Sequence, residues 1–75
     1  MIKPIITYHP NGNKYYEHYY LNHNLHNDNA PAKIYYDELF NNKIRCVEYY
    51  LNNKFLENVS SDDELKKYLK LKNIS

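Results

Sequence analysis

One segment of the chain occurs twice, and this internal repeat constrains the fold more than any other feature of the sequence. Residues 19–25 read YYLNHNL and residues 49–55 read YYLNNKF, so Tyr19 and Tyr49 begin two copies that lie 30 residues apart. A period of about 20 to 50 residues indicates a repeated supersecondary unit. The chain is therefore predicted to be a single domain, residues 1–75, with one repeat over 5–31, a second over 32–58 and a different ending.

Strand and turn signals alternate within each copy. β-branched and aromatic runs are separated by Asn-rich segments such as Asn11-Gly12, which is a strong hairpin signal. The strands are expected at residues 5–8, 14–21, 25–26, 32–36, 44–51 and 55–56. Tyr8 matches Tyr36 at an offset of 28, whereas Asn11 matches Asn41 at 30, so Leu39 and Phe40 form a two-residue insertion in the second copy. We expect an apolar tip on an otherwise polar loop there.

The composition changes after Ser60. Ser61-Asp62-Asp63-Glu64 is a capping box, with acidic residues at the positive end of a helix. Leu65, Tyr68, Leu69 and Lys72 follow at helical spacing and predict a helix over residues 61–72 that packs on the sheet. The predicted fold class is α+β, mainly β: an antiparallel meander of four to five strands with one C-terminal helix.

Tyrosine lies on both faces of the longest predicted strand. Tyr15, Glu17, Tyr19 and Leu21 alternate with Lys14, Tyr16, His18 and Tyr20. One short helix covers only one face, and we expect it over the side of Leu21, Val47 and Leu51. The open face would then expose tyrosines, while about half of all the tyrosines serve only as core. The partner-binding residues predicted on this basis are Tyr16, Tyr20, Tyr35 and Tyr50, together with Leu39 and Phe40 of the apolar tip.

Composition sets limits on the class of function. The chain has 75 residues, a formal net charge of +1 and one cysteine. A domain of this size builds only a thin core, and a charge near zero gives no field for holding a polyanion. The single cysteine and the absence of an apolar leader favour a soluble cytoplasmic protein, in a bacterial cell or in an infected host cell if the source is viral.

Three groups of residues carry atoms suited to chemistry, and each has a simpler structural role. His18, His23, His26 and Asp28 offer metal-ligand atoms, but their spacing matches no zinc pattern, and His26 is better explained by a hydrogen bond to the following loop. Glu17 and Glu48 are predicted on opposite faces as surface or cross-strand charges, not as an acid and base pair. Cys46 occupies the position of Tyr16 in the repeat and is expected to be a small, half-buried residue. We therefore predict no enzyme activity, no metal and no cofactor.

Residues 19–32 follow the repeat pattern aromatic-Tyr-x-Asn-Gly-x-x-His-Arg-x-Asp-Gly-Pro-Ala. The corresponding residues are Tyr19, Tyr20, Asn22, Leu25, His26, Asp28, Pro31 and Ala32, with Asn11-Gly12 for the other turn. The first copy therefore resembles the MORN-like repeats of many bacterial, phage and giant-virus proteins, some of which are YwqK-type antitoxins. His23, Asn27, Asn29 and Ala30 replace the usual Gly, Arg, Asp and Gly, and the second copy has Leu56-Glu57 in place of His-Arg. The resemblance implies a degenerate two-repeat relative with a β-meander scaffold, an interaction role and no catalysis.

The leading hypothesis is a small non-catalytic protein-binding module that inhibits a toxin, a nuclease or a host-defence enzyme stoichiometrically, as antitoxins and phage anti-defence or anti-CRISPR proteins do. The alternative is a protein that binds single-stranded RNA or other nucleic acid by tyrosine stacking and through Lys66, Lys67 and Lys70. An open sheet edge would also suit a homodimer. No membrane partner is expected.

Overall fold

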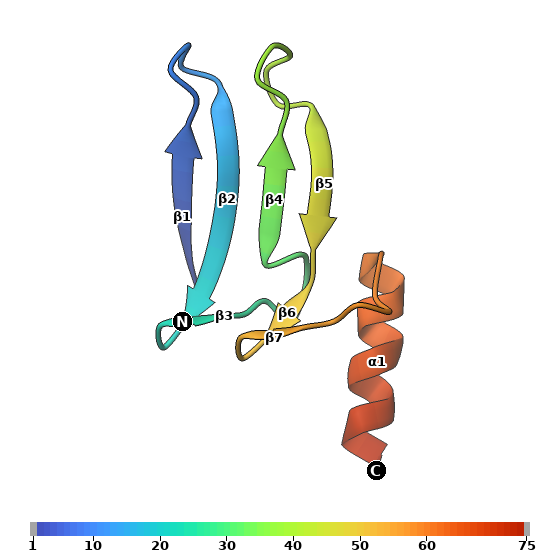
Figure 1. Ribbon diagram of the computed structural model, residues 1–75. Helices are drawn as coiled ribbons and strands as arrows, with labels where there is room; N and C mark the ends of the chain where they lie inside the picture. The colour runs from blue at the N-terminus through green and yellow to red at the C-terminus, as the bar shows by residue number, and fades with distance from the viewer. Residues whose placement is uncertain (1, 75) are drawn as a thin grey trace.

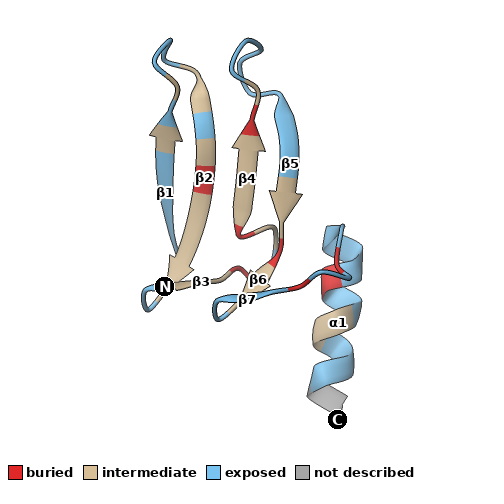
Figure 2. Ribbon diagram, in the orientation of Figure 1, coloured by how far each residue is buried: buried red, intermediate tan, exposed pale blue. Residues whose placement is uncertain are grey.

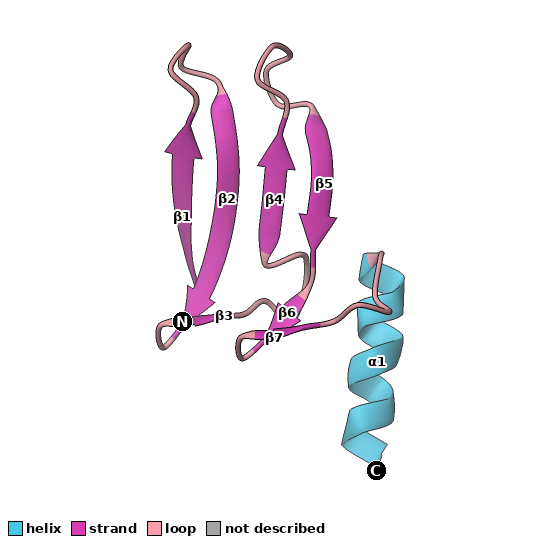
Figure 3. Ribbon diagram, in the orientation of Figure 1, coloured by secondary structure: helices cyan, strands magenta, loops and turns pink. Residues whose placement is uncertain are grey.

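The computed structural model describes residues 2–74, which form seven strands and one helix. Figure 3 shows the helix in cyan after the last strand. The strands are β1 (Lys3–Tyr8), β2 (Lys14–Leu21), β3 (Asn24–Leu25), β4 (Lys33–Tyr36), β5 (Ile44–Glu48), β6 (Tyr50–Leu51) and β7 (Lys54–Phe55), and the helix is α1 (Asp62–Ile74). The predicted class, mainly β with one C-terminal helix, is confirmed.

The strands form one larger antiparallel sheet and one small one. The larger sheet has the order β1-β2-β4-β5, with β3 paired to the end of β2, and β6 pairs only with β7 (Figure 1). The single strand expected over residues 44–51 is divided, because Tyr49 lies between β5 and β6 outside the ladder. Its side chain is instead buried in the core.

The two repeats are visible in the backbone. Six described residues have positive φ, and they form three pairs that are 30 residues apart: Gly12 with Asn42, Asn22 with Asn52, and His23 with Asn53. Positive φ at two successive turn residues is characteristic of a type I′ hairpin. Asn22-His23 joins β2 to β3 and Asn52-Asn53 joins β6 to β7, so each copy ends in the same two-residue hairpin.

The two-residue insertion is also visible. β1 and β2 change register between Thr7 and Tyr8, while β4 and β5 change register between Tyr35 and Tyr36. These irregularities lie 28 residues apart, as expected from the offset of Tyr8 and Tyr36. The second connection therefore accommodates Leu39 and Phe40 in its loop without altering the strands on either side.

The second hairpin turn is fastened to the first copy. The Asn53 amide donates to the Leu25 carbonyl at 2.8 Å, and the Leu25 amide donates to Asn53 Oδ1 at 2.7 Å. The Asn52 amide donates to His26 Nδ1 at 3.0 Å. The hydrogen bond predicted between His26 and its own following loop was therefore wrong, since the imidazole accepts from the turn of the other copy.

The core lies at the end of the molecule where α1 meets the second copy. Tyr49, Leu56, Val59 and Leu65 are buried together, and the residues packed against them are Val47, Leu51, Tyr68 and Leu69 (Figure 2). Val47 and Leu51 face the helix as expected, but Leu21 is not among the residues of this cluster. The helix therefore closes one end of the molecule and does not cover a whole face of the sheet. Its apolar residues Leu65, Tyr68 and Leu69 belong to the core at this end.

Hydrogen bonds fix the start of α1. The Glu64 amide donates to Ser61 Oγ at 3.2 Å, and Glu64 Oε1 accepts from the amide and the hydroxyl of Ser60. The Tyr49 hydroxyl donates to Asp62 Oδ1 at 2.7 Å, and burial together with this bond raises the pKa of Tyr49 to about 12. The capping box predicted at Ser61 is present, although Glu64 reaches back one residue further than expected. Among residues 2–74, no helix combines the length and apolarity needed to cross a membrane.

Candidate protein-binding face

Four aromatic side chains form a ring cluster on one face of the sheet. Tyr16, His18 and Tyr20 alternate along β2, and Tyr35 lies on β4 directly opposite Tyr16. The four residues of the ring cluster are half-buried. Val47, which packs in the core with Leu65 of α1, lies on the other face of the sheet, so the helix leaves the ring cluster uncovered.

His18 lies at the centre of the ring cluster. Its ring stacks on Tyr16 with centroids 4.0 Å apart and meets Tyr35 edge-on at 5.8 Å. Its Nδ1 lies 3.4 Å from the Tyr20 hydroxyl, and its Nε2 is buried without a hydrogen-bond partner. Burial and the nearby Lys33 ammonium lower the pKa of His18, so its imidazole is neutral at pH 7. The neutral ring holds the three tyrosines in fixed positions.

Charged residues border the ring cluster on the side of the second copy. Lys33 lies beside His18 on the neighbouring strand, with its Nζ 3.9 Å from Glu48 Oε1 and 5.1 Å from the centre of the Tyr50 ring. Tyr50 packs on Phe55 with centroids 5.4 Å apart. Tyr50 is thus connected to the ring cluster through Lys33, without direct ring contact among the described pairs.

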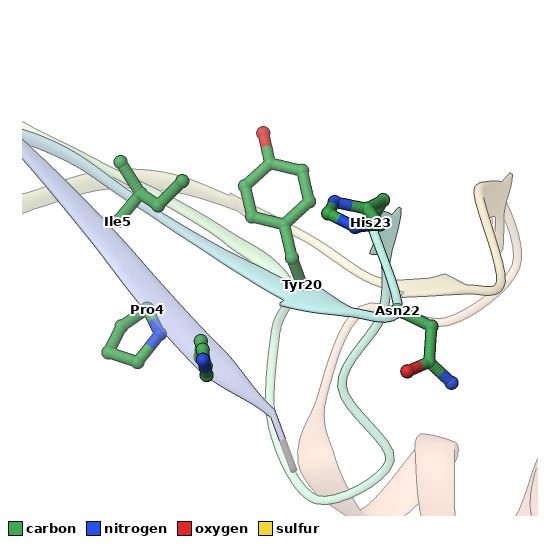
Figure 4. A pocket seen from close by; sticks show the side chains of 6 residues that line it. Pro4, Ile5, Tyr20, Asn22 and His23 are labelled. Atoms are coloured by element: carbon green, nitrogen blue, oxygen red, sulfur yellow. The ribbon is translucent and has the colours of Figure 1, made fainter.

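A shallow groove extends this face at the end of β1 and β2. Figure 4 shows Ile5, Tyr20 and His23 projecting to the same side of the strand pair. Lys3, Pro4 and Asn22 complete the lining. The predicted residue Tyr20 therefore belongs both to the ring cluster and to an apolar hollow beside it.

Leu39 and Phe40 are exposed, at 78% and 61%, whereas the tyrosines of the ring cluster are half-buried. Their loop is ordered by Asp37, whose carboxylate accepts from the Leu39 and Phe40 amides at 2.8 and 3.1 Å. It is attached to the first connection by Asn11 Nδ2, which donates to the Glu38 carbonyl at 2.8 Å. The apolar tip lies at the opposite end of the sheet from β3, β6 and β7 (Figure 1). The structure therefore does not join it with Tyr20 and Tyr50 into one surface.

The other face holds a polar cluster that the sequence analysis missed. Glu17 is only 7% exposed, and its carboxylate accepts from the Tyr19 and Tyr36 hydroxyls, both at 2.7 Å, and from Lys14 Nζ at 3.0 Å. Burial disfavours ionisation, but the hydrogen bonds from Tyr36, Tyr19 and Lys14 outweigh it and hold the pKa of Glu17 below its ordinary value. Burial and the bond to Glu17 raise the pKa of Tyr36 to about 12. The repeat contains a sign that Glu17 is buried. Val47, an apolar residue, occupies the equivalent position in the second copy.

The exposure of several other side chains differs from the sequence prediction. Glu17 and Glu48 do lie on opposite faces, but Glu17 is not a surface charge. Cys46 is exposed, not half-buried, because it lies on an outer strand that no element covers. Of the ten tyrosines only Tyr36 and Tyr49 are buried, fewer than the half expected, because the helix covers so little of the sheet. In the described part of the chain, no three His, Cys, Asp or Glu side chains gather as a metal site requires.

The lysines proposed for nucleic acid lie away from the tyrosines. Lys66, Lys67 and Lys70 are exposed on α1, which packs with Val47 on the face opposite the ring cluster. The tyrosines and the helix lysines therefore do not form one continuous track for nucleic acid.

Comparison of the chain with protein-family models, with curated proteins and with solved structures found no match. The resemblance to MORN-like repeats rests on the sequence residues alone.

Proposed function

We propose that the chain is a non-catalytic protein-binding module that acts as a stoichiometric inhibitor, with the ring cluster as its principal contact surface. The observation that carries this proposal is the arrangement of Tyr16, Tyr20 and Tyr35 around His18 on a face that α1 leaves open. Tyrosine supplies a large contact area at a low entropic cost and is enriched among the residues that dominate binding energy.

Preorganisation supports the same proposal. The tyrosines stack on a neutral imidazole and on each other, with the Tyr16 and Tyr35 centroids 6.1 Å apart, so little side-chain freedom remains to be lost when a partner binds. Lys33 and Glu48 provide a polar rim. The inhibitor would act by occlusion, burying the ring cluster against the partner and blocking the partner's own site.

The class of partner is suggested by the resemblance to antitoxin and phage repeats. A toxin, a nuclease or a host-defence enzyme is the expected partner, because some proteins with such repeats are antitoxins and others come from phages. Because one fold can host many unrelated functions, the test identifies the partner directly.

The test compares tyrosines inside and outside the ring cluster. A tagged chain expressed in its native host should retain one protein at one-to-one stoichiometry, and Tyr20→Ala should weaken that complex by about 2 kcal/mol or more, as expected for an anchor residue. Tyr8→Ala is the matched control, because Tyr8 is exposed and makes none of the ring contacts described. Circular dichroism verifies that both variants fold.

Two outcomes would contradict the proposal. If Tyr20→Ala and Tyr8→Ala retained the partner equally, the ring cluster would not be part of the interface. Recovery of RNA instead of protein, with an affinity that falls steeply with salt and with loss of Lys66 and Lys67, would support the nucleic-acid alternative.

A further inference from the structure

Both outer strands of the larger sheet have an open backbone edge. β1 and β5 are the terminal strands in the order β1-β2-β4-β5 (Figure 1). Each edge carries an isoleucine that is 55% exposed, Ile5 on β1 and Ile44 on β5, and Arg45 and Cys46 of β5 are exposed as well. An open edge with apolar side chains is a template for pairing with another strand.

The repeat specifies how the two edges would pair. Inside the molecule the first copy joins the second through β2 and β4, where Tyr16 faces Tyr35, Glu17 faces Ile34 and His18 faces Lys33. β5 is the second-copy equivalent of β2, and β1 is the first-copy equivalent of β4. The β5 edge of one chain and the β1 edge of another therefore correspond to the two sides of this internal junction.

The register follows from the two offsets. Adding 30 to the β2 residues and subtracting 28 from the β4 residues gives Cys46 facing Thr7, Val47 facing Ile6 and Glu48 facing Ile5. The same offsets convert the observed β4–β5 pairs, such as Tyr35 with Cys46, into the observed β1–β2 pairs, such as Thr7 with Tyr16. The correspondence between the copies is therefore consistent across both hairpins.

We propose that the chain associates with a second copy of itself head to tail, with β5 of one copy paired antiparallel to β1 of the next in this register. Val47 and Ile6 give an apolar cross-strand pair on one face. On the other face Lys3 lies diagonal to Glu48, within reach of a long side chain, so the charges across the junction are complementary. Pro4, which lacks an amide hydrogen, lies just beyond the three pairs.

The assembly is expected to be weak and open-ended. The three predicted pairs equal the number in the internal junction, but that junction is reinforced by contacts between the copies, such as that of the Asn27 amide with the Tyr50 carbonyl. A heterologous contact of this kind extends to longer oligomers unless it closes into a ring. Copies joined at their edges keep the ring cluster exposed, so this inference does not depend on the proposed protein partner.

The first test uses charge at Ile5, which would face Glu48 of the neighbouring copy. Sedimentation velocity of the natural chain should show a mass that rises with concentration above that of the monomer. Ile5→Glu should shift the chain towards the monomer, because like charges directly across strands are destabilising, whereas the matched variant Ile5→Lys should retain or strengthen association. A natural chain that stays monomeric up to its solubility limit, or equal behaviour of the two variants, would overturn the proposal.

The second test uses Cys46 to read the register. Thr7→Cys places a thiol opposite Cys46 of the next copy, whereas Ile6→Cys places one on the other face of the sheet. Mild oxidation should give a ladder of disulfide-linked oligomers with Thr7→Cys and much less with Ile6→Cys. Adding Cys46→Ser should abolish the ladder, and persistent cross-linking in that background would show pairing of β1 with β1 instead.

Discussion

At the scale of single residues, the buried carboxylate of Glu17 depends on hydrogen bonds from its neighbours to stay ionised. It accepts hydrogen bonds from two tyrosine hydroxyls and from the Lys14 ammonium. A buried charge is stable only when such partners compensate for lost hydration. Because Tyr36 comes from β4, the cluster also ties the two repeats together on the face opposite the ring cluster.

Replacing this carboxylate should cost stability only when it is ionised. Glu17→Gln should reduce the free energy of unfolding by about 1–2 kcal/mol at pH 7, since hydrogen bonds to charged groups are the stronger ones. The folded pKa of Glu17 lies below the ordinary 4.5, so the contribution is present above pH 4.5 and is lost as the pH falls through the folded value. Urea denaturation of both proteins from pH 7 down to pH 2 measures this convergence.

Glu48→Gln is the control, because Glu48 makes one partly exposed ion pair, 3.9 Å from Lys33. Its replacement should change stability by less than about 1 kcal/mol. A constant difference between the natural chain and Glu17→Gln at all pH values would show that the charge of Glu17 contributes nothing.

Glu17 and Cys46 also show where reasoning from residue type ends. Alternation along the strands placed Glu17 and Glu48 on opposite faces correctly. It did not reveal that Tyr19 and Tyr36 would enclose the carboxylate, because a partner 19 residues away depends on strand order. The exposure of Cys46 has the same cause, since only the order of the strands makes β5 an edge.

At the scale of elements, the asparagine-rich turns determine the register of the hairpins. Asn22-His23 and Asn52-Asn53 all have positive φ, a conformation that favours glycine and then asparagine. The two turns nevertheless differ in their surroundings. The Asn53 side chain accepts from the Leu25 amide and donates to Asn24 Oδ1 at 2.8 Å, whereas no side-chain hydrogen bond is described for His23.

The same substitution should therefore have different effects on stability in the two turns. His23→Gly relieves a left-handed backbone at φ 70° and should raise the free energy of unfolding by up to about 1 kcal/mol. Asn53→Gly gives less relief, because asparagine tolerates this backbone better than histidine, and it removes the two side-chain hydrogen bonds to the first copy, so it should be neutral or destabilising. Thermal unfolding followed by circular dichroism compares them, and equal stabilisation would mean that the Asn53 contacts carry no energy.

Elements that depend on neighbouring residues could be predicted from the sequence, whereas those that depend on residues far apart in the chain could not. Turns, the two-residue insertion and the helix start depend on neighbouring residues, and the sequence predicted all three. The break between β5 and β6 depends on Tyr49 turning into a core formed with Leu56 and Leu65, which are distant in the chain. No local pattern distinguishes Tyr49 from Tyr19, its counterpart in the continuous strand β2.

At the scale of the whole molecule, stability should be unevenly distributed. The protein is elongated, with extents of 47 × 24 × 16 Å, and the apolar core around Leu65 of α1 is formed with residues of the second copy and the segment that follows it. Repeats that contact only their neighbours have stabilities that are approximately local sums. The first copy is held by hydrogen bonds and by the ring cluster, the second by an apolar core.

A small change in that core should therefore loosen one end of the molecule more than the other. Leu65→Val removes one methylene from the largest fully buried side chain and should destabilise the core by about 1 kcal/mol. Two amides make equivalent hydrogen bonds in the two copies: Leu56 to the Tyr49 carbonyl at 2.8 Å and His26 to the Tyr19 carbonyl at 3.0 Å. Hydrogen exchange of the Leu56 amide should accelerate about fivefold, a factor that corresponds to this energy, while that of the His26 amide changes little.

Leu71→Val is the control, because Leu71 is exposed on the same helix and its replacement should affect neither amide. Equal acceleration of both amides by Leu65→Val would show that the two repeats unfold as one cooperative unit, with the junction between β2 and β4 as strong as the core itself.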